Sequence, residues 1–215
     1  NGIVYLMSGY RGKMLQAVSL AGATGDLTGS DHLLWRHTRS TSYVPSAALY
    51  EQRLYFVRGN TAVLSCLDSM SGEVLYEGQR LPGLREIYAS PVCADGRVYF
   101  TSREGVTVVI KSGATFEQLA VNRIDDEVDA SPAIIGDSIY LRGRQYMYCI
   151  TSDKESNVDR QTLKKKAAAA PAKQFSYRRI GSLGDASERT ASLSIGDIDG
   201  DEDLDIVVAN GRHWA

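Results

Sequence analysis

A short run of carboxylates near the end of this sequence has the residue types and the spacing of a cation site. The stretch SIGDIDGDEDLDIVVANG carries five aspartates within nine residues: Asp197, Asp199, Asp201, Asp203 and Asp205. Carboxylates this close repel one another and raise one another's pKa unless a cation lies among them. Oxygen donors in this number suit calcium, which takes about six to eight oxygens, better than magnesium, which tends to keep its waters.

The spacing of these aspartates predicts how each one binds. Asp197, Asp199, Asp201 and Asp205 hold relative positions 1, 3, 5 and 9 of a calcium loop, and Asp203 is expected to give its backbone carbonyl. Position 12 is Val208, where a helix-flanked calcium loop needs a bidentate glutamate, so strands are expected on both sides. We predict one structural calcium ion that ties a strand-to-strand turn. An exposed Asp-rich turn without an ion is the alternative.

Histidines and cysteines give weaker indications of chemistry. His32 and His37 are close enough in sequence to suggest a metal pair, but we interpret them as solvent-exposed polar residues. Cys66, Cys93 and Cys149 are widely spaced and form no Cys-x-x-Cys motif, which does not support a zinc site. We expect free, buried thiols that act as small apolar side chains.

Catalytic constellations are not evident in the sequence. The acidic run IDDEVDASP, Asp125 to Asp129, is expected to line one face of the fold as solvated carboxylates, with a catalytic pair as the less favoured alternative. We find no Gly-x-Ser-x-Gly motif, Walker-type loop or Rossmann fingerprint, and we predict neither catalytic nor cofactor-binding residues. A net charge of −2 gives no basic excess, so nucleic acid is not expected as a partner. No stretch approaches the ~20 apolar residues of a membrane-spanning helix.

The elements that would position these residues come from a repeat. Four segments, NGIVYLMSG, EQRLYFVRG, DGRVYFTSR and GDSIYLRGR, each place an apolar residue and a tyrosine after a turn. The tyrosines are Tyr5, Tyr55, Tyr99 and Tyr140, at spacings of 50, 44 and 41 residues. A second apolar strand follows each one, and Pro next to Ser precedes the last three, where Pro at a strand start loses no ladder hydrogen bond.

Short strands separated by frequent turns indicate an all-β protein. A unit of about 40–50 residues with roughly four strands is typical of a β-propeller blade. A β-sandwich, the alternative, would not need a recurring unit of this size. We therefore expect about four four-stranded antiparallel blades, which form an incomplete propeller.

One unit contains the stretch CLDSMSGEVLY, from Cys66 to Tyr76. It resembles the Ala-x-Asp-x-x-Thr-Gly-x-x-x-Trp motif of the quinoprotein-type (PQQ-like) propeller repeat. The resemblance implies that Asp68, Ser71 and Gly72 hold the turn between the third and fourth strands, and that Tyr76 replaces the tryptophan that docks between blades. Trp35 is expected to have this docking role in the first unit.

The aspartate loop, Asp197 to Val208, resembles the FG-GAP or VCBS repeat of integrin α-chain propellers and of many secreted bacterial proteins. Glu202 departs from that pattern, because the family usually has glycine there. Between the two kinds of repeat the chain is polar, charged and alanine-rich. We therefore expect a partial PQQ-like propeller over 1–151, a flexible linker over 152–175, and the beginning of an FG-GAP/VCBS domain, as a partial blade, over 176–215.

These resemblances imply a non-catalytic binding or scaffold module of a secreted or surface-associated bacterial protein, located in the periplasm, outside the cell or on its surface. We expect a protein or carbohydrate partner on a propeller face, with calcium in a structural role. The alternatives are a fragment of a PQQ-dependent alcohol or sugar dehydrogenase, and a propeller extension of a larger enzyme or sensor. Resemblance to the dehydrogenases implies a vicinal cysteine pair, a tryptophan floor and a calcium on the propeller axis. None of these is in the sequence, so we do not expect PQQ to bind.

Overall fold

The computed structural model describes residues 2–9, 13–151, 189–196 and 205–211. By its contacts the chain divides into two compact units, Asn1–Ile150 and Thr151–Ala215. The elements of the described residues are all β-strands, paired into small antiparallel sheets, and the fold is all-β as predicted. Within these ranges no helix is long and apolar enough to cross a membrane.

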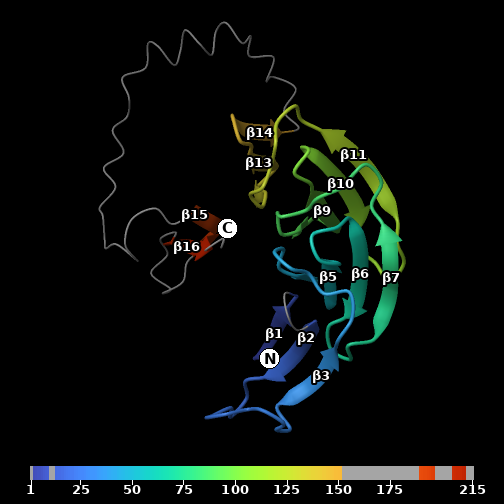
Figure 1. The fold of residues 1–215 in the computed structure, drawn as a ribbon, viewed down its shortest axis with the longest axis vertical. Helices are drawn as coiled ribbons and strands as arrows, with labels where there is room; N and C mark the ends of the chain where they lie inside the picture. The colour runs from blue at the N-terminus through green and yellow to red at the C-terminus, as the bar shows by residue number, and fades with distance from the viewer. Residues whose placement is uncertain (1, 10–12, 152–188, 197–204, 212–215) are drawn as a thin grey trace, which may run out of the picture. The chain divides into compact units, whose positions relative to one another are not determined.

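Four sheets follow one another along the first unit, and we name them blades 1 to 4 (Figure 1). Blade 1 holds β1 (Ile3–Ser8), β2 (Met14–Ser19) and β3 (Leu33–His37). Blade 2 holds β4 (Ala48–Tyr50), β5 (Arg53–Val57), β6 (Val63–Asp68) and β7 (Val74–Arg80). Blade 3 holds β8 (Val92–Ala94), β9 (Arg97–Thr101), β10 (Val106–Lys111) and β11 (Gln118–Arg123), and blade 4 holds β12 (Ala133–Ile135), β13 (Ser138–Arg142) and β14 (Met147–Thr151).

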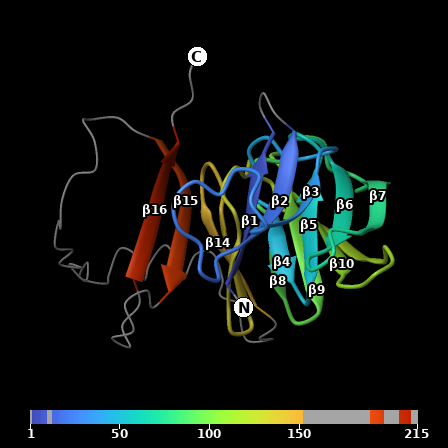
Figure 2. The same ribbon diagram turned by 90° about the horizontal axis from the view of Figure 1, so that it is seen from below.

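Strands adjacent in sequence are adjacent in each sheet, which is the up-and-down order of a propeller blade. The four repeat tyrosines lie on β1, β5, β9 and β13, one in each blade, as the sequence predicts. Figure 2 shows β1, β2 and β3 side by side within blade 1. Blades 2 and 3 have the four strands expected, whereas blades 1 and 4 have three strands each within the described residues.

The strand register shows which residues are equivalent between blades. Cross-strand rows run through Tyr5–Ala17–Trp35 in blade 1, Tyr55–Cys66–Tyr76 in blade 2 and Tyr99–Val109–Ala120 in blade 3. Trp35, Tyr76 and Ala120 therefore occupy the same place on the outer strand of their blades. The docking aromatic that the motif predicts is present in blades 1 and 2 and is replaced by alanine in blade 3.

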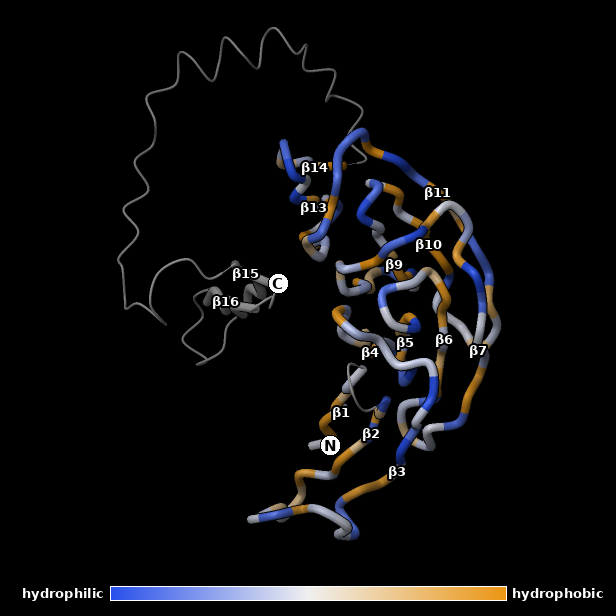
Figure 3. Tube along the Cα trace, viewed as in Figure 1, coloured by the Kyte–Doolittle hydropathy of each residue, from blue (hydrophilic) through white to orange (hydrophobic). Residues whose placement is uncertain are grey.

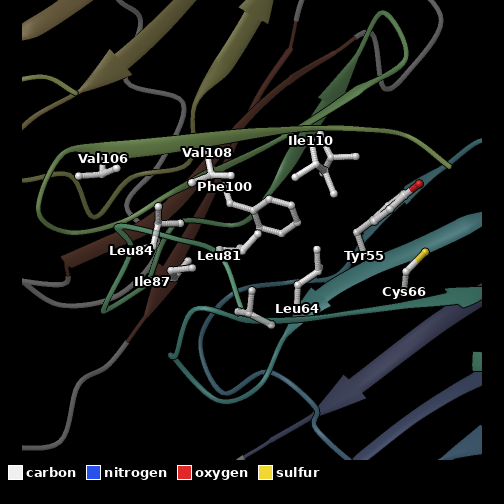
Figure 4. Packing of buried hydrophobic residues seen from close by; sticks show 12 residues of the cluster. Tyr55, Leu64, Cys66, Leu81, Leu84, Ile87, Phe100, Val106, Val108 and Ile110 are labelled. Carbon is white, nitrogen blue, oxygen red and sulfur yellow. The ribbon is translucent and has the colours of Figure 1, made fainter. Parts of the chain in front are cut away.

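The apolar core lies between consecutive blades. One buried cluster joins blades 2 and 3 through the side chains of Tyr55, Val57, Leu64, Cys66, Leu81, Leu84, Ile87, Val98, Phe100, Val106, Val108 and Ile110 (Figure 4). A smaller cluster of Leu15, Leu54, Phe56 and Leu67 joins blades 1 and 2. Colouring by hydropathy shows the apolar stretches within strands such as β1 and β6 (Figure 3). Burial of these faces supplies the main stabilisation of the repeat.

The turn between β6 and β7 is built as the sequence predicts. Asp68 Oδ1 accepts hydrogen bonds from the backbone amides of Met70 and Ser71, at 3.0 and 2.8 Å, and from the Ser71 hydroxyl at 2.9 Å. These bonds, with the Ser71 amide first, lower the pKa of Asp68 below its usual value. Gly72 has a φ of +73°, which a residue with a Cβ adopts only with strain.

Trp35 docks blade 1 onto this turn. Its Nε1 donates a hydrogen bond to the carbonyl of Ser69 at 2.9 Å, and a Cβ placed on Gly72 would lie 2.6 Å from the indole ring. Tyr76 in blade 2 packs edge-on against Phe116 of blade 3, with the ring centroids 6.3 Å apart. The predicted docking roles of both aromatic residues are therefore confirmed.

A ladder of serine hydroxyls joins the inner strands. The Ser46 amide donates to Ser90 Oγ and the Ser90 amide donates to Ser131 Oγ, both at 2.9 Å. Each serine stands two residues before the inner strand of its blade, next to the proline that the repeat carries. The Pro–Ser pair thus starts the strand and links it to the next blade.

The second unit contains a β-hairpin in its described residues. Strands β15 (Arg189–Gly196) and β16 (Asp205–Gly211) pair antiparallel, and the pair Gly196 and Asp205 closes the hairpin next to the aspartate loop. The prediction that strands flank this loop is confirmed, and Ile206 to Val208 enter a sheet as expected. The predicted linker, 152–175, lies outside the described residues.

Candidate functional site

The candidate site lies at one end of the blades. We call this end the loop face. It carries the loops that lead from one blade to the next and the turns that join the second and third strands of blades 2 to 4. Backbone hydrogen bonds tie these segments in sequence: Arg103 N to Glu86 O at 2.8 Å, Val128 N to Arg103 O at 3.0 Å and Arg144 N to Glu127 O at 2.7 Å. Four loops from blades 2 to 4 are thereby held close together.

A cavity of about 970 Å³ opens on this face where blade 3 meets blade 4. Its lining is charged or polar throughout and comes from the β7–β8 and β11–β12 loops and the β9–β10 and β13–β14 turns. The lining residues are Glu86, Arg103, Glu104, Arg123, Asp125, Asp126, Glu127, Arg144 and Gln145. Five carboxylates face three guanidinium groups, so the cavity carries an excess of negative charge.

Asp126 holds the two sides of this cavity together. It is only 8% exposed, and its carboxylate accepts hydrogen bonds from the backbone amides of Glu127 at 2.9 Å, Gln145 at 3.0 Å and Tyr146 at 3.0 Å. The Tyr148 hydroxyl donates a further bond at 3.3 Å. A loop of blade 3 is thus tied to the β13–β14 turn of blade 4 through one side chain.

The surroundings of Asp126 keep it ionised at neutral pH. Burial alone would raise the pKa of this carboxyl, but the amides of Tyr146, Gln145 and Glu127 and the Tyr148 hydroxyl outweigh burial and lower the pKa below its usual value. The neighbouring Gly143 leaves the necessary room, because a Cβ at that position would collide with Asp126 Oδ2.

Two arginines of the cavity are already paired. The Arg103 guanidinium contacts Glu86 at 3.2 Å and Asp129 at 2.8 Å, and it also lies 4.7 Å from the centre of the Tyr88 ring. Arg144 pairs with Glu127 at 3.0 Å. These exposed pairs contribute little stability each but fix the orientation of the cavity wall.

Three charged groups of the lining make no ion pair within residues 2–9 and 13–151: Glu104, Asp125 and Arg123. Glu104 Oε2 is buried, and it also finds no hydrogen-bond partner in that part of the chain. The backbone amide of Ile124 donates a hydrogen bond to the carbonyl of Gly105 at 3.0 Å. Glu104 precedes Gly105 and Asp125 follows Ile124, so the two acidic residues lie next to this hydrogen-bonded pair. Two uncompensated carboxylates therefore come from adjacent backbone positions.

The acidic run Asp125 to Asp129 lines one face, as expected from the sequence. The expectation that all its carboxylates are solvated is wrong for Asp126, which is buried because four donors converge on it. Asp125, Glu127 and Asp129 are exposed as expected.

The predicted calcium ligands stand apart from this cavity in sequence. Asp197, Asp199, Asp201 and Asp203 lie outside the described residues, and Asp205 is the first residue of β16. The calcium loop therefore stays a prediction. Elsewhere in the described ranges, no cluster of three or more His, Cys, Asp or Glu side chains could hold a metal ion.

Two interpretations of single residues need correction. His37 is buried, not solvent-exposed, because it packs edge-on against Phe56 between blades 1 and 2 at 6.0 Å. The cysteines are free as expected, but they are not all buried: Cys66 is buried, Cys93 partly so and Cys149 exposed. Burial raises the pKa of the Cys66 thiol to about 11, which keeps it protonated and unreactive.

Sequence reasoning missed the residues that the other loops bring to the cavity, chiefly Arg103, Glu104 and Gln145. Each lies in the turn that directly follows a tyrosine strand, in the stretches TSREG and RGRQ. Aligning the repeats would have placed these turns at the same end as the acidic run, since each blade reverses direction at every strand.

Comparisons with known proteins support the fold. Neither a family model nor a curated protein sequence matches this chain. Among solved structures, it is similar to the computationally designed Ika4 protein, with 11% sequence identity and a TM-score of 0.52 over 70% of this chain and 86% of Ika4. At such identity the likeness concerns the fold alone.

Two further solved structures are similar with lower TM-scores. The chain is 15% identical to a europium-containing methanol dehydrogenase, with a TM-score of 0.43 over 57% of this chain and 23% of that one. It is 10% identical to BamB from Moraxella catarrhalis, with a TM-score of 0.38 over 68% of this chain and 54% of BamB. The chain thus spans about half the length of BamB and less than a quarter of the dehydrogenase.

Proposed function

We propose that blades 1 to 4 belong to a non-catalytic binding module whose protein partner docks on the loop face, over the cavity between blades 3 and 4. The observation that carries this proposal is the cavity itself, a charged hollow of about 970 Å³ assembled from four loops. Tyr146, 61% exposed, follows Gln145 of the lining in the sequence, and Arg103 and Arg144 lie in the cavity wall. Tyrosine and arginine are the residue types that protein interfaces favour.

The state of the carboxylates supports binding over catalysis. General acid catalysis at neutral pH needs a carboxyl whose pKa is raised, and glycoside hydrolysis needs one such acid beside an ionised partner. The pKa of Asp126 is lowered instead, and its oxygens are occupied by backbone amides. Glu127 is paired with Arg144 and Glu86 with Arg103, which suits a fixed recognition surface.

For the second unit we propose a structural calcium ion held by the side chains of Asp197, Asp199, Asp201 and Asp205 and the carbonyl of Asp203. The pairing of β15 with β16, which ends at Gly196 and Asp205 on either side of the other aspartates in the sequence, supports this proposal. The donor set of hard oxygens suits calcium. Extracellular calcium modules bind at a Kd of ~10⁻⁴–10⁻³ M, so we assign the protein to the periplasm, the cell surface or the exterior.

Charge reversal at the two ends of the blades tests the binding proposal. Arg123→Glu alters the loop face, and Lys111→Glu alters the opposite end of blade 3. Partner proteins cross-linked to the chain in its source cell should be lost with Arg123→Glu and retained with Lys111→Glu. Dye-linked oxidation of alcohols or sugars after addition of PQQ and calcium would overturn the non-catalytic assignment.

Calcium titration by calorimetry tests the second part. Asp201→Ala should abolish the binding heat, whereas Asp31→Ala, which removes a carboxylate from the loop between β2 and β3, should leave it unchanged. Equal heats from Asp201→Ala and the unaltered chain would mean that the aspartates form a solvated turn without an ion.

A further inference from the structure

Glu104 leaves one carboxylate oxygen unsatisfied in the cavity wall. Its Oε2 is buried and has no hydrogen-bond partner within the described residues, and no cationic side chain of blades 1 to 4 pairs with it. A buried carboxylate oxygen without a partner costs free energy, so native proteins retain such a group mainly where something else supplies the missing bond.

The carboxyl of Glu104 is ionised at neutral pH. Burial raises its pKa, whereas the Ser102 hydroxyl and the surrounding backbone amides lower it, and the net pKa lies below the usual value. A negative charge therefore stays inside the cavity wall.

Three of the other four carboxylates of the lining already have partners. Asp126 is saturated by amides, Glu86 contacts Arg103 and Glu127 contacts Arg144. Asp125 is exposed and has no ion pair, and the Gly105–Ile124 hydrogen bond brings its backbone beside that of Glu104. Apart from the amide-bound Asp126, Glu104 and Asp125, which belong to adjacent backbone segments, are therefore the carboxylates of the cavity that no cationic side chain of the described residues neutralises.

We propose that this place receives a basic side chain of the partner protein, a lysine ammonium or an arginine guanidinium, with Glu104 and Asp125 as its acceptors. The inference rests on the proposed function and names the chemistry of the partner's anchoring group. A guanidinium donates several hydrogen bonds in a planar fork and pairs well with carboxylates, and an anchor of this kind is a common interface hot spot. Tyr146, which is exposed and follows Gln145 of the lining in the sequence, offers apolar area for the stem of a long side chain.

The experiment uses blocked hexa-arginine and hexa-glutamate peptides as probes and calorimetry on the whole chain at low and at physiological salt. Glu104→Gln and Asp125→Asn each remove one negative charge from the site and keep the shape of the side chain. Glu117→Gln removes one negative charge at the opposite end of blade 3, where Glu117 pairs with Lys111, and serves as the matched control.

We expect hexa-arginine to bind, and Glu104→Gln and Asp125→Asn each to weaken its binding about tenfold, as the loss of one charge-assisted hydrogen bond implies. Glu117→Gln should leave the affinity unchanged. Equal losses in all three variants would mean a general charge effect and would overturn the proposal, as would preferential binding of hexa-glutamate.

The two proposals can fail separately. One result is that Arg123→Glu abolishes binding of the natural partner while Glu104→Gln and Asp125→Asn leave the affinity for hexa-arginine unchanged. In that case the proposed binding module is supported and the proposed basic anchoring group is wrong. The opposite result is that Glu104→Gln and Asp125→Asn weaken hexa-arginine binding while Arg123→Glu and Glu104→Gln leave binding of the natural partner unchanged. The cavity would then bind cations, and the loop face would not be the partner's docking site.

Discussion

The contact between blades 2 and 3 and the contact between blades 3 and 4 follow the same backbone plan with opposite chemistry. Blades 2 and 3 share a buried apolar cluster that includes Tyr55, Phe100 and Ile110, and Tyr76 adds an aromatic contact across it. Blades 3 and 4 meet through the carboxylate of Asp126 beside a charged cavity. Both contacts contain hydrogen bonds, but a buried apolar cluster dominates the first and the hydrogen bonds of Asp126 dominate the second.

The difference begins at one position of the repeat. Ala120 stands in blade 3 where blades 1 and 2 have Trp35 and Tyr76, and the neighbouring side chains of Leu119 and Val121 are exposed. Without a large aromatic side chain, the outer strand of blade 3 buries little apolar area. The charged cavity thus lies at the contact where the outer strand of the preceding blade lacks the docking aromatic side chain.

Removal of a large core side chain between blades 2 and 3 should cause the largest loss of unfolding free energy. Phe100→Ala empties a fully buried site between blades 2 and 3 and is expected to cost ~3–5 kcal/mol of unfolding free energy. Urea denaturation followed by circular dichroism measures this loss. Tyr146→Ala in blade 4, an exposed side chain, should change stability by no more than ~0.5 kcal/mol. Similar losses in both variants would erase the distinction between the two contacts.

The docking of Trp35 onto the β6–β7 turn comes next. Gly72→Ala should destabilise the chain by more than ~1 kcal/mol, because φ is +73° and the new Cβ meets the indole ring. Gly78→Ala is the matched control: φ is +77° there, but no atom lies within 4 Å of the added Cβ. The excess loss in Gly72→Ala over Gly78→Ala, measured by urea denaturation, is the contribution of the docking contact. Equal losses would show that backbone strain alone matters.

The hydrogen-bonded contact should respond to acid, unlike the apolar one. Because the folded-state pKa of Asp126 is lowered, its contribution to stability is complete above the usual aspartate value of about 3.9 and is lost as pH falls through the lower folded value. We expect the amides of Gln145 and Tyr146 to lose hydrogen-exchange protection in that range while those of β6 and β10 keep it.

Asp126→Asn sharpens this test, because it points an amide NH₂ at backbone donors. Exchange at Gln145 and Tyr146 should already be fast at neutral pH in this variant, without a further acid-induced change. Exchange rates corrected for their intrinsic pH dependence provide the measurement. Unchanged protection at both residues would show that Asp126 does not hold the contact.

We expect the smallest effects on stability from the serine ladder. It places the same kind of hydrogen bond at the contact of blades 2 and 3 and at the contact of blades 3 and 4. Ser90→Ala and Ser131→Ala each remove one acceptor for a backbone amide, worth ~0.5–1.5 kcal/mol. We expect Ser90→Ala to lower the global urea midpoint, because the shared apolar cluster couples blades 2 and 3. Ser131→Ala should raise hydrogen exchange in blade 4 alone. Identical global shifts would mean that blade 4 unfolds with the others.

The sequence by itself determined the local elements of this protein. The four tyrosine strands, the Pro–Ser starts and the turn around Asp68 were all predicted correctly, because each depends on contacts within a few residues. The strands on both sides of the aspartate loop also followed from local pattern. A period of alternating apolar residues and a turn motif require no knowledge of distant parts of the chain.

Tertiary structure alone decided how groups far apart in the sequence meet. Glu86, Asp126 and Gln145 share one cavity although some 60 residues separate the first from the last, and nothing local distinguishes the buried Asp126 from the exposed Asp125. Packing between blades likewise buried His37, which local polarity had placed in solvent. Burial and charge pairing depend on which loops the blade stacking brings together, and that is a property of the assembled sheets and not of any single segment.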